Sequence, residues 1–240
     1  LATEKDDDLV KTQAIDVWSS LAEEEKIRID NRQDHHNFID TALDMIIDMV
    51  LSCIQEIKMG NEEEDEEQEW GTSVAAGCCL NLVSKVVGDK VVTPITNFVA
   101  ENIKPEKSWE NKYCGLLALG AILEGPDPKN LQELLSPAIP QLLDLLDDNY
   151  PKVRFASGWL FSKIAKCNHE LITTKDSFPI LFGKMMDGLK GTGPSCINIC
   201  SIIAELAESI LSRDEVIDSC VLSDVYQDLL IQLKDYVTVE

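Results

Sequence analysis

The chain is 240 residues long, enough for one large domain or about two of ordinary size. Hydrophobic residues make up 45% and charged residues 27% of it, which is typical of a globular rather than a disordered protein. Its 21 basic and 43 acidic side chains give a formal net charge of −22. Because nucleic acids and anionic lipids recruit basic faces, this charge argues against both and favours basic partners.

Targeting and redox signals are sparse. No apolar stretch reaches the roughly 18 residues that a membrane-spanning helix needs, and the acidic first residues do not form a signal peptide. The chain begins with Leu1 rather than Met, so we expect it to be a piece of a longer protein. Its eight cysteines mostly fall within apolar helical patterns, where a free thiol behaves as a small hydrophobe. They predict a reduced, intracellular compartment rather than a disulfide framework.

Helical spacing of apolar residues recurs along almost the whole chain, and no segment shows the alternation or hairpin turns of strands. Breaks at glycine and proline, such as Gly60, Gly88 and Pro151, separate the helical stretches. In chain order we predict helices at 7–29, 35–58, 70–88, 90–103, 108–124, 129–147, 150–168, 171–190, 194–212 and 215–236. Short connections between them indicate antiparallel neighbours.

The second helices of successive pairs align as a repeat. The equivalent positions Val74, Lys112, Arg154 and Cys196 are 38, 42 and 42 residues apart. Helix pairs of this period are the signature of HEAT or armadillo solenoids, in which each pair buries its apolar stripe only against its neighbours. We therefore predict an all-α superhelical solenoid of about five HEAT repeats over 1–240. The acidic stretch 60–69 is predicted to be a loop inserted within it.

The acidic loop carries seven carboxylates within eight positions. Their mutual repulsion predicts a solvated loop, and two interpretations stay open: a solubilising insert, or a clamp for a Lys/Arg-rich partner. Trp70 favours the clamp, because an indole face attracts the stem and charge of Lys or Arg. Calcium binding is weakly supported, since the spacing of an EF-hand loop is missing. The carboxylates are Glu62, Glu63, Glu64, Asp65, Glu66, Glu67 and Glu69.

Tryptophans form the second group of candidate binding residues. Trp70, Trp109 and Trp159 fall at or near the starts of second helices, where an indole either fills the core or lines a binding wall. Trp18 is predicted to pack in the core. A row of indoles alternating with carboxylates would grip an extended or helical basic peptide through many modest, salt-dependent contacts.

A second acidic cluster lies near the end of the first helix. Glu23, Glu24 and Glu25 are either a solvated helix surface or an anchor for basic residues of a partner. Both interpretations stay open at this point.

Catalytic chemistry finds little support in the sequence. His35 and His36 have no third ligand at a set spacing, and no phosphate-binding loop, nucleophile elbow or dinucleotide motif is present. We predict no enzymatic activity, no cofactor and no metal site. An all-α enzyme with a carboxylate metal site stays an alternative, and it would need several Glu or His side chains to converge in one pocket.

The acidic run that ends in Trp70, followed by a helix carrying Ala75-Ala76-Gly77-Cys78, resembles the acidic loop of the importin-β family of nuclear transport receptors. The resemblance covers nearly the whole chain, more weakly after about residue 200. Further motifs that carry it are Gln13–Ser19 with the acidic cluster after it, Ser108-Trp109, Ile122–Pro128, and Val153-Arg154 with Trp159.

The resemblance implies a middle segment of such a receptor, with Trp159 and Asn198 on its inner wall. It implies as partners the basic importin-β-binding segment of importin-α or other basic cargo, the GTPase Ran, whose GTP form displaces cargo, and nucleoporin Phe-Gly repeats on the outer helices. Neither nucleic acid nor membrane is an implied partner, and the implied location is cytoplasm, nucleus and nuclear pore. Tyr113, Phe155 and Ser201 depart from the family pattern, and the missing Trp at 201 puts one adapter contact in doubt. The alternative is another HEAT scaffold, such as a phosphatase regulatory subunit.

Overall fold

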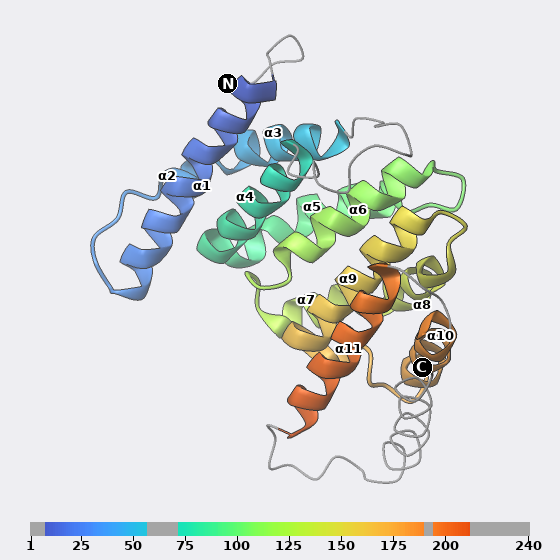
Figure 1. Cartoon of the computed structure of the whole chain (residues 1–240). Helices are drawn as coiled ribbons and strands as arrows, with labels where there is room; N and C mark the ends of the chain where they lie inside the picture. Colours follow the sequence, from blue (N-terminus) through green and yellow to red (C-terminus); the bar gives the residue numbers. More distant parts are fainter. Residues whose placement is uncertain (1–7, 57–71, 190–193, 212–240) are drawn as a thin grey trace, which may run out of the picture.

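The computed structural model describes residues 8–56, 72–189 and 194–211, and within these ranges every regular element is a helix (Figure 1). The prediction of an all-α chain is therefore confirmed for this part of the protein. The α-helices are α1 (Asp8–Asp30), α2 (Phe38–Thr41), α3 (Leu43–Gln55), α4 (Thr72–Val87), α5 (Val92–Asn102), α6 (Trp109–Ile122), α7 (Pro128–Leu135), α8 (Ile139–Asp144), α9 (Pro151–Asn168), α10 (Ser177–Leu189) and α11 (Pro194–Leu211). Short 3-10 helices are η1 (Gly88–Val91), η2 (Ser136–Ala138), η3 (Leu145–Asp147) and η4 (His169–Leu171).

Local chemistry sets the helix ends. After α1, the Gln33 amide donates to the Arg28 carbonyl and Arg32 takes a left-handed conformation with φ 54°, the pattern of a Schellman motif. Gly88 supplies the same conformation after α4, with φ 61°, where it has no Cβ penalty. At the start of α7 the Asp127 side chain accepts the Lys129 amide at 2.8 Å, and Pro128 occupies the first turn.

Several predicted helices are divided in the structure. The stretch 129–147 becomes α7, η2, α8 and η3, because Pro137 and Pro140 each remove a backbone donor. The stretch 35–58 is divided at Ala42 into α2 and α3, and α10 begins only at Ser177. The predicted helix 215–236 lies outside the described residues.

The helices form two layers. Helices α1, α4, α6, α9 and α11 contact one another in that order, and we call them the second-helix layer (Figure 1). Helices α3, α5, α8 and α10 contact α4, α6, α9 and α11 or their flanking turns, and we call them, with α7, the first-helix layer. One apolar core runs between the layers, and its fully buried members include Ile46, Leu80, Leu119, Phe161 and Ile202. This is the neighbour-to-neighbour packing of a solenoid, as the repeat predicts.

The cysteines divide between core and surface. Cys53, Cys79 and Cys114 are buried, as predicted, and burial raises the pKa of the Cys79 thiol to about 11 and that of Cys114 to about 12. Cys78 and Cys200 are exposed. All seven cysteines of the described ranges are free thiols.

Candidate functional site

The open side of the second-helix layer carries Trp159, one of the predicted partner-binding side chains. On α6 the partly exposed residues Tyr113 and Leu117 are one turn apart, and on α9 Phe155 and Trp159 have the same spacing. Side chains at i and i+4 lie on the same side of a helix; on this side Phe155 and Trp159 are open, whereas Tyr113 and Leu117 also pack partly against the core. This face is the candidate functional site.

The side chain of Trp159 extends from α9 onto the neighbouring helix α6. Its ring lies over Gly120 of α6 so closely that a Cβ at that glycine would come 2.1 Å from the Trp159 Cζ3 atom. The indole is half-buried and is not one of the partly buried side chains that pack against the core. It therefore lies across α9 and α6 and keeps part of its surface open to solvent.

Asn198 joins α11 to α9 from the same side. Its side-chain amide donates to the Phe155 carbonyl oxygen at 2.9 Å, and its Cβ lies where a Cβ on Gly158 would come within 2.8 Å. Asn81 of α4 also joins two neighbouring helices, because its side-chain amide donates to the Ala121 carbonyl of α6 at 2.9 Å. The 7% exposure of Asn198 limits any role in binding to positioning of the α9 surface.

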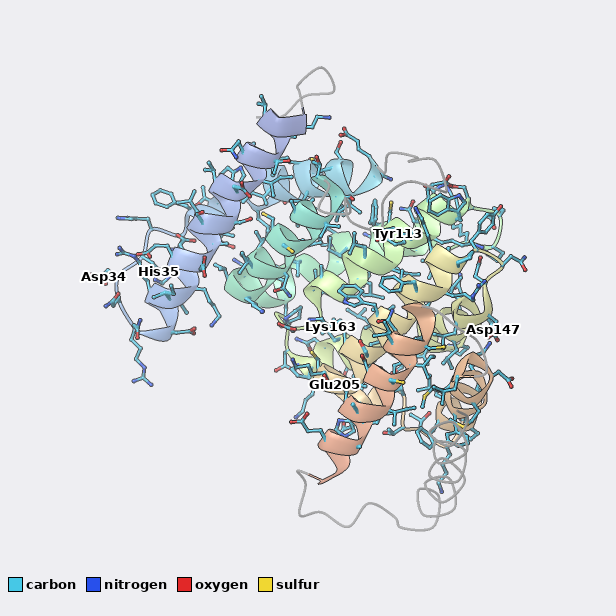
Figure 2. All side chains as sticks on the ribbon, in the orientation of Figure 1. Asp34, His35, Tyr113, Asp147, Lys163 and Glu205 are labelled. Atoms are coloured by element: carbon cyan, nitrogen blue, oxygen red, sulfur yellow. The ribbon has the colours of Figure 1, made fainter. Side chains whose placement is uncertain are left out.

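A row of charges crosses the C-terminal ends of the second helices. Glu124, just after α6, accepts from Lys85 of α4 at 2.6 Å and from Lys163 of α9 at 2.7 Å. Hydrogen bonds from Lys163 and Lys85 lower the pKa of the Glu124 carboxyl to about 2. Figure 2 shows Lys163 on α9 and Glu205 on the neighbouring α11. The row ties α4, α6 and α9 together.

A second charged group lies at the N-terminal ends of the helices. Lys112 of α6 pairs with Asp148 at 2.9 Å, with side chains only 13% and 9% exposed. Arg154 of α9 donates to the Asp148 carbonyl at 2.8 Å and to the Asn149 carbonyl at 3.1 Å. Hydrogen bonds from the Tyr150 amide and from Lys112 lower the pKa of the Asp148 carboxyl and outweigh the opposing effect of its burial. These bonds position the turn before α9.

Trp109 is already engaged within the chain. Its ring stacks on Tyr150 with centroids 6.2 Å apart, and the Lys152 ammonium lies 5.4 Å from the ring centroid. The indole also packs against the core. Trp109 therefore has features of both a core residue and a binding residue, since it packs against the core and also holds a cation on its ring. Trp18, predicted as a core residue, is partly buried and packs against the core.

The three glutamates near the end of α1 have different environments. Glu25 is 4% exposed, and its carboxylate accepts the Phe38 amide at 2.7 Å and the Ile39 amide at 3.1 Å, which caps α2. Glu24 pairs with Arg28 at 2.7 Å on the surface, and Glu23 is exposed. Glu23 and Glu24 are therefore accessible to a partner, whereas Glu25 is a structural residue that neither sequence interpretation described.

The acidic loop of 60–69, with Glu62 to Glu69, and Trp70 lie outside the described residues, so their predicted role stays a prediction. Within the described ranges, no group of three or more His, Cys, Asp or Glu side chains is arranged to hold a metal. No helix among them is long and apolar enough to span a bilayer.

Sequence reasoning placed Glu25 in the acidic cluster but did not predict its capping role, and it did not predict the ion pairs of Glu124. A signal for Glu124 is present, since Lys85 and Lys163 each lie 39 residues from it, close to one repeat. No local pattern marks Glu25, because the amides that it caps lie 13 and 14 residues further along the chain.

Comparison with solved structures defines the class of protein. The chain superposes on the yeast importin-beta Kap95p in its structure with RanGDP, with a TM-score of 0.83, 24% identity, and coverage of 95% of this chain and 26% of that one. It also matches Kap95p in a Kap95:Nup1 complex, with a TM-score of 0.78, 25% identity, and coverage of 85% and 24%. The fold is thus that of an importin-beta HEAT solenoid, as predicted.

Sequence comparison points to relatives with the same fold. Importin subunit beta-1 of Schizosaccharomyces pombe is 28% identical over 202 residues, 80% of this chain and 23% of the relative, and that of Saccharomyces cerevisiae is 28% identical over 213 residues, 84% and 24%. The chain is a homologue of importin subunit beta-1 over about 80% of its length. It spans about a quarter of the length of these relatives. No protein-family model matches it. Importin-beta transport receptors are not enzymes, in agreement with the prediction of a binding protein.

Proposed function

We propose that the chain is a segment of a nuclear import receptor that binds a basic segment of importin-α or of cargo, and that releases it when Ran·GTP binds. The observation that carries the proposal is the similarity to importin subunit beta-1 over 80% of the chain. The net charge of −22 supports it, since such a field attracts basic polypeptides and speeds their association.

Two groups of residues are proposed to receive the basic segment. The acidic loop supplies charge, and Trp70 at its end supplies an aromatic face for Lys or Arg stems. On the second-helix layer, Trp159 offers a half-exposed indole, and Asn198 positions the α9 surface beside it. Glu23 and Glu24 extend the acidic surface at the α1 end. Trp109 contributes less, because Lys152 already occupies its ring.

Release is proposed to follow from linkage. Each second helix contacts only its neighbours, so small shifts between repeats add up along the layer. If the basic segment and Ran·GTP favour different curvatures, each weakens the binding of the other by the same factor. Kap95p is described with RanGDP and with Nup1, and Ran and Phe-Gly nucleoporins are accordingly proposed as further partners of this chain.

The test is binding of a fluorescent Lys/Arg-rich adapter peptide to the full chain, measured by anisotropy at low and at high salt. One variant neutralises the loop residues Glu62, Glu63 and Glu64 to Gln, and a second carries Trp70→Ala. The matched control, with the same change in net charge, neutralises exposed carboxylates elsewhere: Glu106→Gln, Glu133→Gln and Asp176→Asn.

We expect the loop variant to weaken binding about tenfold, and Trp70→Ala by about threefold or more, with the control near wild type. Higher salt should weaken the wild-type complex, because the contacts are between exposed charges. If neither variant binds more weakly than the control, the basic clamp is wrong. Addition of Ran loaded with GTP should release the peptide, and continued binding at saturating Ran would contradict the proposed release step.

A further inference from the structure

The row of charges at the C-terminal ends of the second helices divides its lysines unequally between two carboxylates. Glu124 accepts from Lys85 of α4 at 2.6 Å and from Lys163 of α9 at 2.7 Å. Glu205 of α11 is half-buried, and among the described residues no lysine or arginine lies within ion-pair distance of its carboxylate. One acid therefore holds two cations, while the acid on α11 holds none.

Lys163 lies beside Glu205 as well as beside its present partner. The Asn198 Cβ of α11 packs against the α9 backbone at Gly158. The two helices run in the same direction, so Glu205, seven residues beyond Asn198, is level with the turn of α9 that carries Lys163 (Figures 1 and 2). Burial raises the pKa of the Cys167 thiol in the next turn, and the charges of Glu205 and Lys163 act on that thiol in opposite directions. Lys163 thus stands between an acid on α6 and an acid on α11.

The lysine side chain can reach either acid. Packed helices lie about 8–10 Å apart, and a lysine carries its charge on a flexible four-carbon stem with three donors. The Lys163 and Glu124 side chains are 28% and 23% exposed, so water can take the place of a departing partner. Neither chain length nor burial holds Lys163 on Glu124.

We propose that Lys163 is an exchangeable ion-pair partner, which leaves Glu124 for Glu205 when α11 approaches α9 at this edge of the layer. Lys85 stays on Glu124 after the exchange, so each carboxylate then holds one lysine. The ion pair moves from the contact between α6 and α9 to the contact between α9 and α11, and no carboxylate is left unpaired. This edge therefore has two arrangements, and a shift between repeats selects one of them.

Lys166 is the other candidate cation for Glu205. It lies on α9, three residues beyond Lys163, is exposed, and also acts on the Cys167 thiol. It is not paired with Glu205 in this structure, and it serves as the matched control for Lys163. The exchange is a property of the free chain. Its test therefore needs no partner, and the result does not depend on whether the proposed binding of a basic segment is correct.

The first test is zero-length cross-linking of the full chain with a carbodiimide at low conversion, followed by mass spectrometry of the linked peptides. The reagent joins an amine only to a carboxylate that contacts it. We expect the wild type to give a Lys163–Glu124 product and a smaller amount of a Lys163–Glu205 product. Glu124→Gln should raise the Lys163–Glu205 yield at least threefold. Glu101→Gln, which removes an exposed pair with Lys104, should leave that yield unchanged.

The second test is a double-mutant cycle of Lys163→Met and Glu205→Gln, measured by urea unfolding. In the wild type the coupling factor on the unfolding equilibrium constant should be close to one, because Lys163 is on Glu124. In the Glu124→Gln background it should rise about two- to fivefold, as for a partly exposed ion pair. The same cycle with Lys166→Met in place of Lys163→Met should show no rise.

Three results would overturn the exchange. The first is a wild type that gives no Lys163–Glu205 product, because Lys163 is then fixed on Glu124. The second is a yield or a coupling factor that Glu124→Gln leaves unchanged. The third is a rise in coupling that belongs to Lys166, because Glu205 then takes its partner from a different position on α9.

Discussion

The six-membered ring of Trp159 lies against the Cα of Gly120 on the preceding second helix, leaving no room for a Cβ there. Gly120→Ala would therefore push the indole off α6 or force the two helices apart. Overpacking of this kind costs about 1–3 kcal/mol, and we expect that loss in the free energy of unfolding by urea. A change in tryptophan emission should accompany it.

The control for Gly120 is Gly183→Ala on α10, where an added Cβ meets nothing within 4 Å. That change should be neutral or stabilising by about 1 kcal/mol, since alanine favours the helix. Equal stability of the two variants would show that Trp159 does not rest on Gly120.

Glu124 should make stability depend on pH in a defined window. Its folded-state pKa, about 2, lies below the ordinary value of 4.5, so the carboxylate stabilises the fold above pH 4.5 and loses this effect as the pH falls through about 2. Glu124→Gln leaves Lys85 and Lys163 without their acceptor and should cost about 1–3 kcal/mol at neutral pH. The difference between wild type and variant, measured by urea unfolding, should shrink steadily between pH 4.5 and 2.

Glu101 provides the comparison for Glu124. It pairs with Lys104 at 2.8 Å on an exposed surface, and hydrogen bonding to that lysine lowers its pKa as well. Glu101→Gln should nevertheless leave unfolding unchanged, because water screens an exposed pair. A loss as large as that of Glu124→Gln would contradict the special role assigned to the three-helix row.

Glu25 should be needed for the turn between α1 and α2. Glu25→Ala removes the acceptor of the Phe38 and Ile39 amides and should cost about 1.5–3 kcal/mol, as for hydrogen bonds to a charged group. Hydrogen exchange at these two amides should speed up more than exchange elsewhere in the chain. Glu23→Ala, at an exposed neighbouring position, should change neither stability nor exchange.

Asn198 should stabilise the contact between α9 and α11. Asn198→Ala loses the bond to the Phe155 carbonyl and should lower the free energy of unfolding by about 1 kcal/mol. Asn198→Asp should cost more, because a carboxylate oxygen would then face a carbonyl oxygen. Asn81→Ala removes another amide-to-carbonyl bond between neighbouring helices and should have a similar cost. A neutral result for Asn198→Asp would contradict this assignment.

Much of the fold could be predicted because its signals are local or periodic. Apolar spacing and the glycine and proline breaks placed α1, α4, α6, α9 and α11 close to their observed ends. The division of the predicted helix 35–58 at Ala42 could not be predicted, because no residue type there marks a break in the apolar pattern. The division of 129–147 is signalled by its prolines, but a prediction based on apolar spacing alone does not take them into account.

The candidate site was predictable only in part. Trp159 falls on the open face because its position in the repeat decides which side of the helix it occupies. Its overlap with Gly120 required the structure, since it depends on how far α9 is shifted along α6. The different environments of Glu23, Glu24 and Glu25, which are adjacent in sequence, likewise follow from the path of the chain after α1.

By itself the amino-acid sequence determined that the chain is helical, repeats at about 40 residues and is related to importin-β. These properties follow from spacing and residue type along one chain. Only the tertiary structure decided that Glu124 joins two lysines, that Glu25 is buried as a cap, and that Phe155 and Ile197 are exposed. Those contacts depend on the rotation and offset of neighbouring helices, which a linear pattern does not specify.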